Sequence, residues 1–118
     1  IVTNGDFITK LITQNNLYLL LDIAHAMVTA HNKKTTYQDY IESLPLDNLI
    51  QLHICQPLLP VGKTAQDAHD EPNTEMMNEV IRLINEFPQI KYLTVEFYKD
   101  KDILVRSLNN LKDYRDGQ

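Results

Sequence analysis

The chain has 118 residues, of which 43% are hydrophobic and 23% charged, and its formal net charge is −5. This composition is typical of one globular domain. The acidic balance argues against nucleic acid as a partner, because phosphate binding usually needs a positively charged stripe. The longest apolar run, Leu17 to Leu21, is too short to cross a membrane. Cys55 is the one cysteine, so no internal disulfide is possible, and we expect a protein of the reducing cytoplasm.

Helices and strands alternate along the first half of the chain. Apolar residues at helical spacing predict a helix over Phe7–Asn15. The nearly continuous apolar run Leu17–Ile23 is typical of a buried parallel strand, and a short helix is expected over Ala24–Asn32. A threonine cap and a closing proline place another helix over Thr35–Leu44, and partial alternation predicts a strand over Asn48–Cys55.

The second half continues the alternation after a long polar stretch. Pro57–Asp70, which contains two prolines and a glycine, is predicted to be a loop, and loops of this length are usually functional or disordered. Asn73–Phe87 has the clearest helical apolar face. A strand over Lys91–Tyr98 and a helix over Asp100–Tyr114 complete the pattern. Strands that alternate with helices predict an α/β fold with a parallel sheet.

Three strands are few for a free-standing α/β domain. They suit about the last half of an eight-stranded (β/α)8 barrel, which usually needs roughly 250 residues. The chain starts at Ile1 and not at methionine. We therefore expect residues 1–118 to form one partial barrel domain that continues N-terminal of residue 1.

Residues that commonly bind metals stand at the end of each predicted strand. The carboxyl ends of parallel strands meet at one edge of the sheet, where α/β proteins place their sites. A metal ion would also neutralise the crowded carboxylates of the sequence DAHDEP, which begins at Asp67. The candidate metal ligands are Asp22, His25, His53, Asp67, His69 and Glu96.

The spacing of these residues allows them to converge. Asp22 and His25 share a face if the chain turns helical after the strand, and Asp67 and His69 point the same way from an extended segment. Six side chains are too many for one metal that keeps an open position, whereas two or more metals bridged by carboxylates would use them. Imidazole and carboxylate ligands suit iron, manganese or zinc and disfavour copper(I).

Each candidate also has an ordinary structural interpretation. An aspartate after a strand, such as Asp22, is usually a helix cap or turn residue. His53 taken singly is more often a hydrogen-bonded core histidine, and Glu96 could be an ion-pair partner. The agreement of all three strand ends favours the metal site.

Three neighbouring residues are assigned structural roles. Asp70 and Glu71 are predicted to be first-turn acids that complement the dipole of the following helix. Cys55 is expected to be a buried structural thiol. Because it stands two residues after His53 and so on the same strand face, a role in the site stays open.

Four segments resemble a known family: LLLDIAHAMVTAHN, YIESLPLDNLIQLHI, DAHDEP and YLTVEF. Their order and spacing are similar to those of DUF692, also called UPF0276, the multinuclear non-heme iron-dependent oxidative enzymes. The resemblance covers about Leu17 to Tyr98, which corresponds to the C-terminal half of a family member. It implies a TIM barrel related to xylose isomerase, with two or three iron ions held by histidine, aspartate and glutamate.

The resemblance also implies which residues bind iron. His25 stands where many members have asparagine, and the sequence from His53 to Gln56 is HICQ where the family often has His-Leu-Ala-Gly. The loss of that glycine affects the expected loop shape and substrate specificity. The family's N-terminal histidine and glutamate ligands have no counterpart in this chain. The residues that match family ligands are Asp22, His53, Asp67, His69 and Glu96.

The implied activity is oxidation of a ribosomally made peptide by iron and molecular oxygen, typically at cysteine. A small partner protein that holds the precursor peptide is expected beside it. Two alternatives stay open: another metal-dependent barrel enzyme, of the sugar isomerase or endonuclease IV type, and a non-catalytic barrel fragment. LDIAH fits the first alternative as well, whereas DAHDEP fits it less. Iron with oxygen dependence, or zinc without it, would separate the enzymes.

Overall fold

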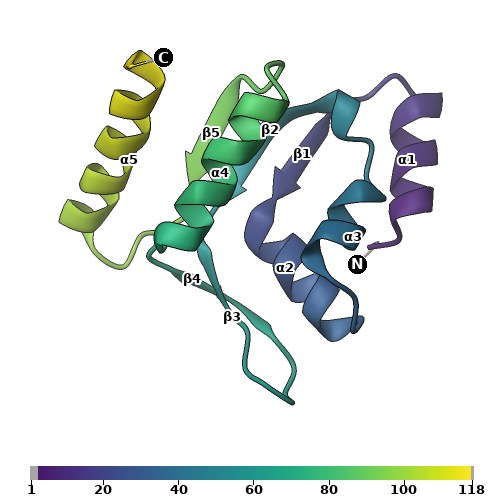
Figure 1. The fold of residues 1–118 in the computed structure, drawn as a ribbon, viewed down its shortest axis with the longest axis horizontal. Coiled ribbons are helices and arrows are strands. Elements are labelled where there is room, and N and C mark those ends of the chain that lie inside the picture. The colour runs from purple at the N-terminus through teal and green to yellow at the C-terminus, as the bar shows by residue number, and fades with distance from the viewer. Residues whose placement is uncertain (1–2, 118) are drawn as a thin grey trace.

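Three parallel strands form the central sheet of the computed structural model, which describes residues 3–117 (Figure 1). The strand order is β1-β2-β5, and a separate antiparallel pair, β3-β4, extends from it. The predicted α/β fold with a parallel sheet is confirmed. The elements are α1 (Gly5–Gln14), β1 (Leu19–Asp22), α2 (Ile23–Asn32), α3 (Tyr37–Glu42), the 3-10 helix η1 (Leu46–Asn48), β2 (Leu49–Ile54), β3 (Gln56–Leu58), β4 (Gln66–Asp70), α4 (Thr74–Glu86), β5 (Tyr92–Val95) and α5 (Lys101–Asp116).

The register of the sheet brings the candidate residues to one edge. Asp22 at the end of β1 lies opposite His53 of β2, and His53 lies opposite Thr94 of β5. Glu96 follows the last paired residue of β5, and its backbone N–H still donates to the Ile54 carbonyl at 2.8 Å. The carboxyl ends of β1, β2 and β5 therefore form a common rim.

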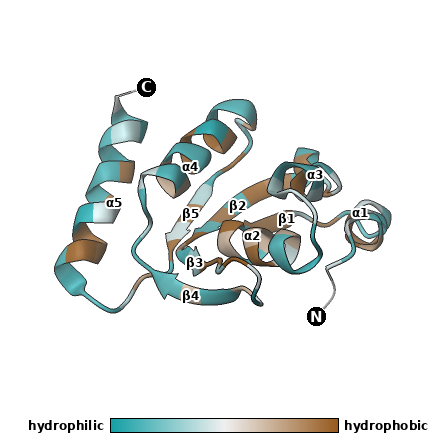
Figure 2. Cartoon of the chain, turned by 60° about the horizontal axis from the view of Figure 1, so that its bottom comes forward, coloured by the Kyte–Doolittle hydropathy of each residue, from teal (hydrophilic) through white to brown (hydrophobic). Residues whose placement is uncertain are grey.

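The two faces of the sheet differ in their side chains. Alternate residues such as Leu21, Leu52 and Ile54 are buried in the core beside apolar residues of α2 and α4. The opposite face carries Gln51 and Leu20, and Leu20 is 45% exposed. Figure 2 shows β2 as mainly hydrophobic and β4 as hydrophilic. The site residues of β2 thus project from the face that lies away from the core.

The prediction of a loop over Pro57–Asp70 is wrong at both ends of this range, where the structure has strands. β3 and β4 form an antiparallel hairpin in which Gln56 pairs with Asp70 and Leu58 with Gln66. Gly62 at its tip has φ +69°, a left-handed conformation that glycine adopts without strain. Short polar strands with a proline carry no strong periodic signal, which is why the sequence reads as loop.

The end of this hairpin also corrects the roles predicted for two acidic residues. Asp70 ends β4 and forms an ion pair with Lys99. The Glu71 carboxylate lies 3.1 Å from the Arg106 guanidinium on α5. Both carboxylates thus tie the hairpin to the C-terminal part of the chain, and the acidic residue in the first turn of α4 is Glu75.

No helix among residues 3–117 is both long enough and apolar enough to cross a membrane. The residue on which the expected N-terminal continuation rests, Ile1, lies outside the described residues.

Candidate metal centre

Asp22 joins the end of β1 to the start of α2. Its Oδ1 accepts a hydrogen bond of 2.8 Å from the His25 backbone N–H, so Asp22 is the N-cap of α2. Its Oδ2 lies 3.4 Å from Nδ1 of His25. The ordinary interpretation of Asp22 as a helix cap is therefore right. The cap uses one oxygen and leaves the other directed at a histidine of the site.

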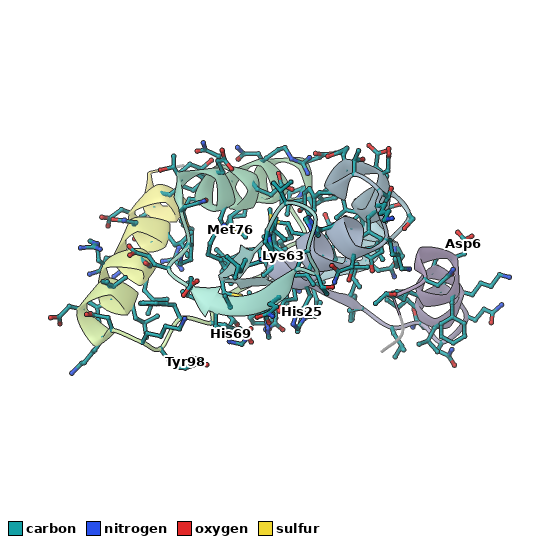
Figure 3. All side chains as sticks on the ribbon, turned by 90° about the horizontal axis from the view of Figure 1, so that it is seen from below. Asp6, His25, Lys63, His69, Met76 and Tyr98 are labelled. Carbon is teal, nitrogen blue, oxygen red and sulfur yellow. The ribbon has the colours of Figure 1, made fainter. Side chains whose placement is uncertain are left out.

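Asp67 on β4 brings two histidines together. Its Oδ2 lies 2.6 Å from Nε2 of His25 and 2.6 Å from Nε2 of His69. Figure 3, which views the molecule from below, shows the two labelled histidines near each other beside β4. His25 is the open member of the cluster, with its side chain 62% exposed, whereas that of Asp67 is 16% exposed.

His53 and Glu96 form the second contact of the cluster, on β2 and just after β5. Nδ1 of His53 lies 2.7 Å from Oε1 of Glu96. The side-chain amide of Gln51 lies 3.2 Å from Nε2 of His53 and 3.2 Å from the Thr94 hydroxyl oxygen. Gln51 and Glu96 contact different nitrogens of the His53 ring. Gln51 thus orients His53.

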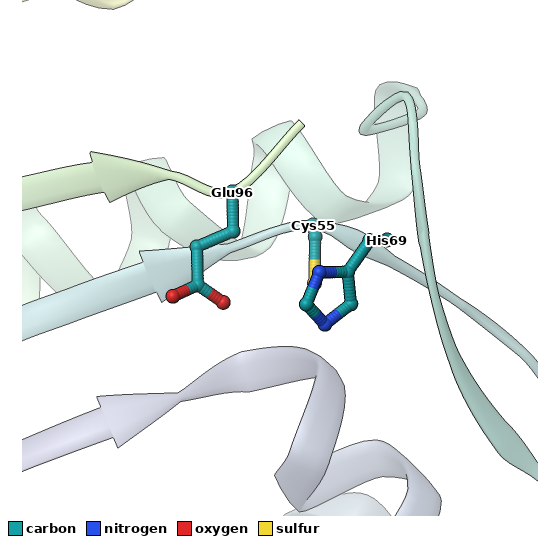
Figure 4. Close-up of side chains that lie close together, drawn as sticks. All are labelled: Cys55, His69 and Glu96. Atoms are coloured by element: carbon teal, nitrogen blue, oxygen red, sulfur yellow. The ribbon is translucent and has the colours of Figure 1, made fainter. Parts of the chain in front are cut away.

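Two groups of three potential ligands share one carboxylate. One ligand atom from each of Asp22, His53 and Glu96 lies within 4.8 Å of the others. The same holds for Cys55, His69 and Glu96, which Figure 4 shows close together. We call these groups the aspartate triad and the cysteine triad. All six predicted ligands therefore lie in one cluster, although His25 and Asp67 belong to neither triad.

Cys55 and Gln51 are site residues that the ligand prediction did not include. The thiol of Cys55 is fully buried and donates to Oδ1 of Asp67 over 3.4 Å. Both residues occupy the same strand face as His53, two positions away on either side. Period-two spacing from His53 is the sequence signal that indicates Cys55, and the same signal could have found Gln51.

Burial and the neighbouring polar and charged groups shift the pKa values of three groups of the cluster. Burial raises the pKa of Asp22, against the stabilising effect of the His25 backbone N–H. Burial, followed by the negative charges of Asp67 and Asp22, also raises the pKa of the Cys55 thiol. Burial acts to raise the pKa of Asp67 as well, but hydrogen bonds from His69 and Cys55 outweigh it, and the pKa falls below its ordinary value. The Asp67 carboxylate thus keeps its negative charge at neutral pH.

A metal ion fits this set of donors. Nδ1 of His69 is buried and has no hydrogen-bond partner among residues 3–117, which leaves its lone pair free once Nε2 donates to Asp67. A histidine whose second nitrogen is held by a carboxylate is the usual arrangement at metal sites. Imidazole and carboxylate donors at the ends of adjacent parallel strands define an α/β protein with a candidate metal centre.

Comparison with known families identifies the chain more closely. A family model described as "RiPP precursor modification enzyme MbnB/TglH/ChrH" matches residues 2–112, and the chain belongs to this family. RiPPs are ribosomally synthesised and post-translationally modified peptides, so the family consists of enzymes that act on peptide precursors. A search of curated proteins finds no match to the chain.

Proposed function

We propose that this protein is a metal-dependent oxidative enzyme that modifies a ribosomally made peptide, at cysteine, with a multinuclear iron centre and molecular oxygen. The observation that carries the proposal is the pair of triads that share Glu96. A carboxylate with two oxygens can bridge two metal positions, whereas separate triads would make separate sites. Family membership supplies the peptide as substrate class. The resemblance to DUF692 enzymes supports iron as the metal, molecular oxygen as the oxidant and cysteine as the modified residue.

The protein residues would hold and orient the metal ions. Glu96 would be the ligand common to both triads, and Asp22 would offer the oxygen that lies away from the helix cap. Asp67 touches the imidazoles of both His25 and His69, so it either binds beside them or fixes their ring orientation. Iron held in this way would supply one-electron chemistry with oxygen, which side chains lack.

The sheet is, in this proposal, part of a TIM barrel of the xylose isomerase type. Helices cover one face, and the other face carries the polar residues that lead to the site. The outer edges of β1 and β5 have no strand neighbour among the described residues, so further strands can pair there. Candidate ligands at the carboxyl ends of parallel strands agree with the usual place of barrel active sites.

Two further elements belong to the same proposal. A small partner protein would hold the leader of the precursor peptide while its cysteine enters the site. The enzyme would work in the cytoplasm, where reducing conditions keep the peptide cysteine as a thiol before it is oxidised.

Metal content is the first test of the proposal. The full-length protein is purified without oxygen, and its metals are measured by elemental analysis beside His69→Ala and the control His31→Ala. His31 lies on α2 and contacts the Lys63 carbonyl at 2.9 Å, outside both triads. We expect two or more irons per chain in the wild type and in His31→Ala, and a sharp loss in His69→Ala because a free imidazole nitrogen is removed.

The other outcomes of this measurement are equally informative. Zinc in place of iron would favour a barrel enzyme of the isomerase or endonuclease type, in which the metal polarises its substrate without oxygen. Absence of any metal would contradict the ligand assignment. If iron is found, a cysteine-containing precursor peptide is incubated with and without oxygen, and a mass change that requires oxygen identifies the oxidative reaction.

A further inference from the structure

Cys55 occupies an unusual place for a structural thiol. Free buried cysteines generally pack among apolar side chains. Cys55 has no exposed surface, yet its sulfur faces an imidazole and two carboxylates, those of His69, Asp67 and Glu96. A thiol gains little from burial beside negative charge, so packing alone does not explain this position.

The geometry of the cysteine triad suits a ligand. One donor atom from each of Cys55, His69 and Glu96 lies within 4.8 Å of the other two, and the side chains come from three separate segments of the chain (Figure 4). Nδ1 of His69 is buried without a partner among residues 3–117. The cluster thus combines a sulfur, a free nitrogen and a carboxylate oxygen, which is a donor set for a transition metal.

We propose that Cys55 is a metal ligand, so that its sulfur, the His69 imidazole and Glu96 hold one ion next to the ion of the aspartate triad. On binding, the sulfur–metal bond replaces the S–H bond and the thiol proton passes to solvent, as metals deprotonate the thiols that bind them. The two positions then differ, one with a sulfur donor and one with only oxygen and nitrogen. This inference rests on the metal centre proposed above.

A second role for Cys55 must be separated from metal binding. The thiol donates to Asp67, which contacts His69, so Cys55 could instead be a positioning residue that acts through Asp67. Cys55→Ser keeps a donor of similar size for Asp67 but removes the sulfur. Cys55→Ala removes both. A ligand role predicts that both variants lose the metal, whereas a positioning role predicts that serine rescues what alanine loses.

Cobalt(II) is the probe, because a thiolate bound to it gives a sulfur-to-metal charge-transfer absorption band. The full-length protein, purified without oxygen and freed of metal, is titrated with cobalt(II) beside both variants, and far-ultraviolet circular dichroism checks their folding. We expect the band in the wild type, its loss in both variants, and binding at one position weakened by about tenfold or more. A wild type that binds cobalt without the band decides against Cys55 even if a variant fails to fold.

The contradicting outcomes are distinct. Cobalt that binds to the wild type without a charge-transfer band would overturn the role of Cys55 and leave the proposed metal centre intact. The same conclusion follows if Cys55→Ser binds as much cobalt as the wild type. A wild type that binds no cobalt and no iron would overturn the metal centre and, with it, this inference.

Discussion

At the scale of single residues, the site depends on side chains that fix the histidine rings. The Gln51 amide contacts Nε2 of His53, and the Asp67 carboxylate contacts Nε2 of His69. In each case one ring nitrogen is occupied and the other is directed into the cluster. A ring that is held in one orientation loses less freedom when it binds a metal.

Gln51→Leu tests this orientation. Leucine has a similar size but offers no polar group to Nε2 of His53, so the ring can rotate. We expect iron affinity to fall about 10- to 100-fold while the protein stays folded, measured by competition with a chelator. Thr94→Val is the control, since it removes the second partner of Gln51 and leaves the contact with His53. Equal losses in both variants would assign Gln51 a general packing role.

At the scale of elements, polar contacts join helices α3 and α4. The Tyr37 hydroxyl at the start of α3 donates to Glu79 of α4 over 2.7 Å. Arg82 holds the same carboxylate from one turn further along α4. Burial first, and then the hydrogen bond to Glu79, raises the pKa of Tyr37. None of these three residues belongs to either triad, so we expect the contact to affect stability and not metal binding.

Tyr37→Phe should lower the free energy of unfolding by about 1.5 kcal/mol at neutral pH, because the hydrogen bond to a charged acceptor is lost. The folded protein keeps the Tyr37 proton above pH 10, the ordinary pKa, whereas the unfolded chain releases it. The stability due to Tyr37 is therefore present below pH 10 and falls as the pH rises above it.

Urea unfolding at several alkaline pH values measures this effect. The wild type should lose more stability above pH 10 than Tyr37→Phe does. Tyr18→Phe is the control, because Tyr18 is 72% exposed. If the wild type and Tyr37→Phe lose the same amount of stability above pH 10, Tyr37 does not cause the loss.

At the scale of the whole molecule, negative charge is concentrated at one rim of an acidic chain. Asp22, Asp67 and Glu96 come from three different segments of the chain and meet there. Like charges so close destabilise the folded state unless a cation lies between them. The metal-free protein is thus expected to be less stable than the loaded protein.

Adding iron(II) without oxygen should raise the melting temperature, and a chelator should reverse the rise. At a free iron concentration of about 100 times the dissociation constant, the free energy of unfolding should rise by about 2.7 kcal/mol. Glu96→Gln should reduce the rise in melting temperature, because both triads lose their shared ligand. Glu42→Gln, at the end of α3 and outside the cluster, should respond like the wild type. An unchanged melting temperature in the wild type would show that folding does not create the site.

Much of the fold could be predicted because the spacing of apolar residues along the chain indicates which side chains are buried in the core. The apolar run around Leu21 and the helical face of α4 identify elements that bury apolar side chains, and alternating strands and helices pair in parallel. The six candidate ligands can be predicted because the carboxyl ends of all strands in a parallel sheet lie along one rim. Their clustering is observed, and their binding of metal stays a prediction.

What the tertiary structure alone decided is which polar group meets which. The β3–β4 hairpin, the pairing of Asp70 with Lys99 and the place of Cys55 beside His69 all join residues that are distant in the sequence. Burial leaves a periodic pattern along the chain, so the sequence by itself determines which elements form the core. Contacts between polar side chains depend on the direction of individual hydrogen bonds after the core has packed. No local sequence pattern encodes these contacts.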